Sequence, residues 1–118
     1  MTQQEMIKKI VRTLDSKKAE SIEAIRVKDL TILADYFIIA SGNSNTQTKA
    51  LAEEVEFQLS QAGIEPTRRE VDTGNTWFIL DYADILVHVF YKETREFYNL
   101  ERVWADGEKL DVSELLED

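Results

Sequence analysis

The chain has 118 residues, a formal net charge of −9 and no cysteine. This length is typical of a single domain with a modest core, and the lack of cysteine excludes disulfides, thiol nucleophiles and thiolate metal sites. The surplus of acids argues against a nucleic-acid binder, because neutralising phosphates requires Lys and Arg. We find neither a signal-peptide pattern nor an apolar run of membrane-spanning length, so we expect a cytoplasmic protein.

The acidic charge has two interpretations. It can serve solubility alone, which composition favours, or it can match the field of a basic protein partner. The acids are concentrated at the end of the chain, where Trp104 to Asp118 contain six acids and one lysine.

The first half of the chain predicts one helix and two strands. Apolar residues at helical spacing predict a helix over about residues 3–18. The alternation from Ser21 to Lys28 predicts a strand with an irregularity, and the apolar run over residues 35–40 predicts a buried strand.

A second helix should follow this buried strand. Ser44 and Gln47 have the spacing of a capping box, and Gly63 is a suitable residue just beyond a helix end. The polar segment over residues 66–71 predicts a strand at a sheet edge, and residues 72–75 predict a turn.

Two apolar runs, residues 77–80 and 85–91, lie four residues apart and predict an antiparallel hairpin. Because successive residues in both runs are apolar, helices should cover both faces of their sheet. A third helix is predicted over residues 93–105, and the acidic tail, residues 107–118, is expected to fray. The predicted fold is therefore one α/β domain over residues 1–106, in which a mixed (α+β) sheet of about five strands is flanked by three helices.

Signals for catalysis are weak. The Ser41–Ser44 junction could offer amides to a phosphate, but a helix cap explains the same residues. Asp81 and Asp84 could contribute to a metal site, although stabilising a turn is the favoured role. The only histidine, His88, lies between apolar neighbours, so a buried hydrogen-bonded side chain is favoured over a general base. We predict no metal and no cofactor.

Two aromatic residues border the predicted turns. Trp77 follows a polar turn at the start of a strand, and Tyr82 lies in the next turn between acids. Aromatic residues in such places are either core edges or interface anchors. A core edge is favoured for Trp77 and exposure for Tyr82. Protein binding is thus better supported than catalysis.

Three motifs together resemble the ribosomal silencing factor family, also called the Iojap family. They occur in the family order over residues 30–106. One departure is Ala83, where the family often has Gly. The motifs are Asp35–Ser44 with Gln47; Trp77 with Asp81–Asp84 and Val87–Phe90; and Arg95, Tyr98–Glu101, Trp104 and Asp106.

The resemblance implies a nucleotidyltransferase-like fold and a function without catalysis. Family members bind the large ribosomal subunit through large-subunit ribosomal protein fourteen. There they block joining of the small subunit and repress translation under nutrient limitation. The resemblance further implies little direct nucleic-acid contact and allows a homodimer when the protein is free. The related fold leaves a nucleotide-dependent transferase as the alternative.

Matching positions suggest five residues for contact with the ribosomal partner. Trp77 and Tyr82 would be apolar anchors, joined by Leu80. Asp81 and Asp84 would be charged partners or would shape the turn.

Overall fold

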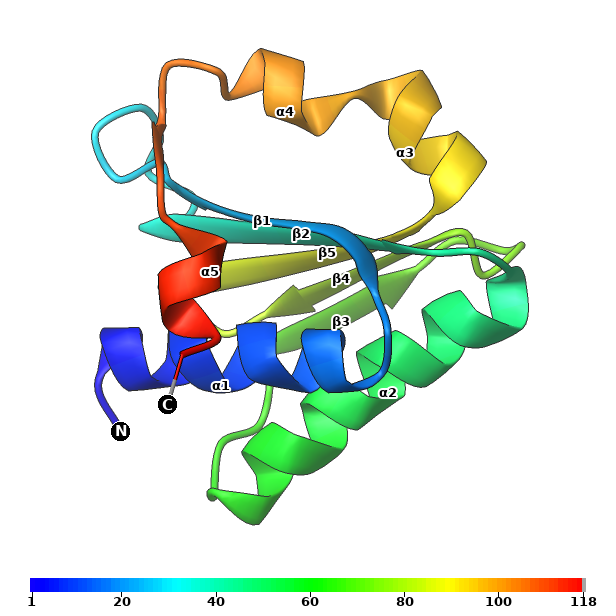
Figure 1. Cartoon of the computed structure of the whole chain (residues 1–118), viewed down its shortest axis with the longest axis horizontal. Helices are drawn as coiled ribbons and strands as arrows, with labels where there is room; N and C mark the ends of the chain where they lie inside the picture. Colours follow the sequence, from blue (N-terminus) through cyan, green and yellow to red (C-terminus); the bar gives the residue numbers. More distant parts are fainter. Residues whose placement is uncertain (118) are drawn as a thin grey trace.

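The computed structural model describes residues 1–117. Its strands form one sheet in the order β3-β4-β5-β2-β1-β6, with helices on both faces (Figure 1). The predicted mixed α/β fold is confirmed, although the sheet has six strands rather than about five. The elements are α1 (Gln3–Ser16), β1 (Glu20–Arg26), β2 (Tyr36–Gly42), α2 (Asn45–Gln61), β3 (Arg68–Val71), β4 (Trp77–Asp81), β5 (Ile85–Tyr91), α3 (Lys92–Tyr98), α4 (Leu100–Val103), β6 (Glu108–Lys109) and α5 (Val112–Leu115).

The sheet is mixed because β2 and β5 are parallel while the other neighbouring strands are antiparallel. The predicted hairpin of β4 and β5 is confirmed, with Trp77 opposite Phe90. The polar strand β3 lies at the sheet edge with its four residues exposed, as predicted. The predicted irregularity of β1 is a register shift after Glu20, where Ser21 has a φ of 50°.

Local hydrogen bonds explain where α2 begins and ends. Ser44 Oγ accepts from the Gln47 amide at 3.0 Å, as the predicted cap requires. Gln47 Oε1 accepts from the Asn43 amide at 2.6 Å, so the return bond is made one residue earlier than in a standard capping box. After the last turn, Gly63 adopts a φ of 79°, which a residue without Cβ tolerates at no steric cost.

Two cores lie on opposite faces of the sheet. On one face α1 and α2 pack against residues such as Phe78 and Leu80, and on the other α3 and α4 lie over residues such as Phe37 (Figure 1). The predicted third helix is two short helices, because Asn99 has a left-handed φ of 48° that interrupts the α-helical backbone.

The prediction of a frayed tail is wrong for the described residues 107–117. Strand β6 pairs with the Ile25–Arg26 end of β1, and α5 lies against α1 (Figure 1). The physical reason is that apolar residues alternate with the acids, so one side of the tail is partly buried while the acids remain exposed. The residues that pack against the first core are Leu110, Val112, Leu115 and Leu116.

Gly107 allows this tail to approach the sheet. A Cβ at Gly107 would lie 2.5 Å from Ile25 Cγ2 and 2.8 Å from the Arg26 carbonyl oxygen. Only glycine therefore fits where the chain turns into β6. None of the helices within residues 1–117 combines the length and apolarity that a bilayer crossing needs.

Candidate functional site

Strand β4 presents alternate residues to the two faces of the sheet. Phe78 and Leu80 pack into the core beneath α1 and α2, whereas Trp77 and Ile79 pack against the core beneath α3 and α4. Trp77, Ile79 and Asp81 are each only partly buried. The β4 end of this face is thus partly open, and we call Trp77, Ile79 and Asp81 the β4 face.

Trp77 is both a core edge and a partly exposed aromatic side chain. Its ring stacks on Phe90 with centroids 4.8 Å apart and an interplanar angle of 29°. Its Nε1 donates to His88 Nδ1 at 3.2 Å. The favoured core-edge position is confirmed by this packing, and the Trp77 side chain is only partly buried.

His88 is buried beneath Trp77, as predicted. Its ring lies edge-on to Phe37 with centroids 5.1 Å apart. Burial lowers the pKa of His88 to about 4, so the imidazole is neutral near pH 7. Because Nδ1 accepts from the indole, the proton belongs on Nε2, which has no hydrogen-bond partner among residues 1–117.

The turn after β4 is built by its acids. Asp81 Oδ1 accepts from the Ala83 amide at 2.8 Å, which supports the predicted turn-stabilising role. Ala83 has a φ of 69°, a left-handed conformation that favours glycine. The Asp84 carbonyl accepts from the amides of Asp35 and Tyr36 at 2.8 and 3.0 Å, so the turn also anchors the start of β2.

Two of the predicted contact residues are buried. Leu80 is 0% exposed and Tyr82 is 6% exposed, so the predicted exposure of Tyr82 is wrong and Leu80 presents no surface. Strand alternation explains both, because Leu80 and Tyr82 follow Phe78 toward the face covered by α1 and α2. Burial, with smaller contributions from Glu56 and Glu65, raises the pKa of Tyr82. Trp77, Asp81 and the exposed Asp84 remain accessible.

Two exposed aromatic residues beside Trp77 were not among the predicted contact residues. Phe97 is 81% exposed and Tyr98 is 47% exposed, and the Tyr98 ring lies 4.7 Å from that of Trp77. The sequence predicted one helix over residues 93–105 and assigned neither side chain to a contact surface. Adjacent residues on a helix lie about 100° apart, so two neighbouring aromatic residues cannot both point directly into a core. That was the available signal.

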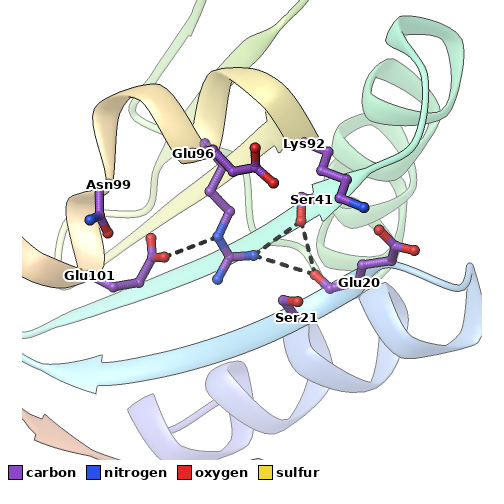
Figure 2. A pocket seen from close by; sticks show the side chains of 8 residues that line it. Glu20, Ser21, Ser41, Lys92, Glu96, Asn99 and Glu101 are labelled. Carbon is purple, nitrogen blue, oxygen red and sulfur yellow. Dashed lines mark hydrogen bonds and ion pairs between the residues drawn. The ribbon is translucent and has the colours of Figure 1, made fainter.

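A polar pocket of about 350 Å³ lies on another side of α3 (Figure 2). Arg95 is 7% exposed there and donates to Ser41 Oγ at 3.1 Å and to the Glu20 carbonyl at 3.4 Å. Its Nε and Nη2 lie 3.4 Å from Glu101 and 3.5 Å from Glu23. These bonds connect α3 and α4 to β1 and β2, so Arg95 acts as a clamp between layers.

The geometry gives little support to transfer chemistry. No group of three or more His, Asp or Glu side chains within residues 1–117 is arranged to hold a metal ion. The Ser41–Ser44 junction is capped by Ser44 itself, as favoured above. The transferase alternative therefore gains nothing from the arrangement of the carboxylates.

The chain is similar to known proteins over almost all of its length. Residues 1–118 match the family described as "Ribosomal silencing factor during starvation". The chain is 38% identical over 112 residues to "Ribosomal silencing factor RsfS" of Halalkalibacterium halodurans, covering 95% of this chain and 96% of that protein. It is 30% identical over 99 residues to "Protein Iojap, chloroplastic" of Zea mays, covering 80% of this chain and 41% of that protein.

A solved structure agrees with these sequence matches. The crystal structure of a protein from Chromobacterium violaceum has a TM-score of 0.85 and 33% identity, covering 94% of this chain and 92% of that one. The similarity of sequence and fold extends from α1 into the tail. The chain therefore belongs to the ribosomal silencing factor family.

Proposed function

We propose that this protein binds the large ribosomal subunit through large-subunit ribosomal protein fourteen. In doing so it would block joining of the small subunit and repress translation under nutrient limitation. The observation behind this proposal is the partly open β4 face, where Trp77 is rigidly held yet accessible. Interface anchors are typically aromatic residues of this kind, which lose little conformational entropy on binding.

The charges around this face suit a basic partner. Asp81 is partly exposed at the end of β4, and Asp84 is exposed in the turn that follows. The whole chain has a net charge of −9. Opposite fields speed encounter between proteins, and ribosomal proteins are mostly basic. Leu80 and Tyr82 would contribute indirectly. Their buried side chains fix the strand and turn that present Trp77, Asp81 and Asp84.

Steric exclusion requires no reaction, and the relatives are named as silencing factors rather than as enzymes. The protein would occupy the face of the large subunit that meets the small subunit. Contact with ribosomal RNA would be minor because phosphates repel the acids. Because it would act on ribosomal subunits, the protein would work in the cytoplasm.

The decisive experiment is sedimentation of purified large subunits with this protein, followed by addition of small subunits. We expect the protein to migrate with the large subunit and to prevent reassociation. Trp77→Ala should weaken binding by about 2–4 kcal/mol, the range for an aromatic anchor. The matched control is Phe57→Ala, which removes an exposed aromatic from α2 on the opposite face.

Circular dichroism should show that both variants remain folded. If wild-type protein neither binds the large subunit nor prevents reassociation, the proposed function is wrong. If folded Trp77→Ala binds as tightly as wild type, the β4 face is not the contact surface.

The same face would support a homodimer in the free protein, since it combines an aromatic side chain with partial exposure. Analytical ultracentrifugation should then find a concentration-dependent dimer that Trp77→Ala weakens. A monomer at every concentration would contradict this part of the proposal.

A further inference from the structure

A hollow of about 500 Å³ lies beside Trp77, between α3 and the turn that precedes β4. We call it the aromatic hollow. Six of its lining residues carry the argument, and they are either aromatic or acidic. No Lys or Arg is among the residues that line the hollow. The aromatic members are Trp77, Tyr91, Phe97 and Tyr98, and the acidic members are Asp72 and Glu93.

The aromatic side chains hold one another in place. Trp77 and Tyr98 have centroids 4.7 Å apart at 46°, and Phe97 stands edge-on to Tyr98 at 5.1 Å and 89°. Trp77 is fixed from below by Phe90 and by its bond to His88. The exposed faces of Phe97 and Tyr98 are therefore available to a ligand. The negative face of an aromatic ring attracts a cation that lies over it.

Hydrogen bonds favour the charged form of one carboxylate in the hollow, that of Asp72. Asp72 accepts from the amides of Thr76 and Trp77 at 2.6 and 3.0 Å. Burial opposes its charge, but the hydrogen bonds from Thr76 and Trp77 outweigh burial and lower the pKa of Asp72. Glu93 is exposed in the first turn of α3. The hollow thus offers two carboxyl groups beside aromatic faces.

We infer that the aromatic hollow takes an arginine side chain from the ribosomal partner. A guanidinium group is planar, stacks on aromatic rings and pairs with carboxylates through several donors at once. A lysine ammonium forms fewer such contacts and is more strongly hydrated. This inference rests on the proposed function, because a basic ribosomal protein would supply the arginine beside the surface that meets Trp77.

The first test measures affinity for purified large ribosomal subunits. Phe97→Ala and Glu93→Gln should each weaken binding by roughly five-fold, the scale of one exposed cation–π or charge contact. Two matched controls should bind like wild type. Glu96→Gln removes a charge from the same helix outside the hollow, and Phe57→Ala removes an exposed aromatic from α2. If the hollow variants bind as tightly as these controls, the inference is wrong.

The second test separates failure of this inference from failure of the proposed function. A Gly-Arg-Gly peptide is titrated into labelled protein, and Gly-citrulline-Gly serves as the uncharged control of equal shape. We expect the arginine peptide to shift the NMR signals of the Trp77 indole N–H and of the Phe97 and Tyr98 amides. Phe97→Ala should reduce these shifts.

This result can be obtained even if the protein fails to bind ribosomal subunits. Equal shifts from the citrulline peptide, or from a lysine peptide of the same length, would overturn the assignment of the hollow to arginine. The same holds if the arginine peptide shifts no signal from the residues that line the hollow.

Discussion

Trp77 Nε1 donates to His88 Nδ1 at 3.2 Å, which connects the aromatic residue of the β4 face to a buried imidazole. The bond requires His88 Nδ1 without a proton, so it depends on the neutral form of the ring. The orientation of the proposed contact residue is therefore linked to the protonation of a buried residue.

The first prediction concerns pH. Burial lowers the pKa of His88 from its ordinary 6.5 to about 4 in the folded protein. Below pH 6.5 the unfolded chain binds this proton more readily than the folded protein does. The contribution of neutral His88 to the free energy of unfolding is therefore fully present above pH 6.5 and is lost as the pH falls toward 4. The loss is about 3 kcal/mol across this window. Urea unfolding at a series of pH values measures it.

The control for this prediction is His88→Gln, whose side-chain oxygen can still accept from the indole. Carboxylates also titrate below pH 5, so the comparison belongs between pH 6.5 and 5. The variant should show a flatter pH dependence there. Equal slopes in the two proteins would mean that His88 titrates normally and that burial does not hold it neutral.

The second prediction concerns the turn between β4 and β5. Ala83 has a φ of 69°, where a Cβ is unfavourable. Ala83→Gly should relieve this strain and raise the free energy of unfolding by about 0.5–1 kcal/mol, after allowance for the greater freedom of Gly in the unfolded chain. Denaturant unfolding measures the change.

The reverse substitution provides the comparison for Ala83. Gly63 has a φ of 79°, and nothing lies within 4 Å of a Cβ built there. Gly63→Ala should therefore destabilise through the backbone alone. If both substitutions shift stability in the same direction, left-handed strain is not what governs these two positions.

Local patterns predicted the elements whose boundaries depend on near neighbours. The α2 cap at Ser44, its end before Gly63 and the β4–β5 hairpin all follow from residues within a few positions of one another. The burial of His88 followed from its apolar neighbours on β5. In each case short-range sequence information was sufficient.

Other features depend on distant packing and could not be predicted in the same way. Tyr82 looked exposed between two acids, yet its side chain packs into the core between the sheet and helices α1 and α2. The tail looked too acidic to fold, but α1 and β1 provide the apolar surface that orders it. The aromatic hollow exists because Asn99 ends α3 and leaves Phe97 and Tyr98 beside Trp77. Only the assembled layers bring these residues together.

The third prediction concerns the attachment of the tail. A Cβ at position 107 would lie 2.8 Å from the backbone oxygen of Arg26, which cannot move without disturbing β1. Gly107→Ala should lower the free energy of unfolding by about 1–3 kcal/mol, the cost of overpacking. Hydrogen exchange should also show weaker protection of the Leu110 amide, which donates to the Ala24 carbonyl at 2.8 Å.

Gly74 provides the matched substitution. A Cβ there would meet only Thr76 Cγ2 at 3.5 Å, an ordinary contact. Gly74→Ala should change stability by less than about 0.5 kcal/mol. If both variants lose similar amounts of unfolding free energy, the close approach of Gly107 to β1 is not the reason that position 107 requires glycine.

The last prediction concerns the clamp formed by Arg95. Arg95→Met should lower the free energy of unfolding by about 2–3 kcal/mol, because it leaves Glu101 in a partly buried site without its cation. One Glu101 oxygen already has no hydrogen-bond partner in the described chain, so the remaining charge would be poorly compensated. Thermal or urea unfolding of Arg95→Met, Glu101→Gln and the double variant gives the coupling energy between the two residues.

We expect that coupling to be about 1–2 kcal/mol, with the double variant more stable than the two single losses would predict. The comparison is the exposed pair of Arg26 and Asp29, in which Arg26 Nη1 lies 3.1 Å from Asp29 Oδ2. Exposed pairs couple by less than about 1 kcal/mol because water screens them. If Arg95 and Glu101 couple no more strongly than Arg26 and Asp29, the buried guanidinium does not hold α3 and α4 against the sheet, and the packing of Leu100 and Trp104 must do so instead.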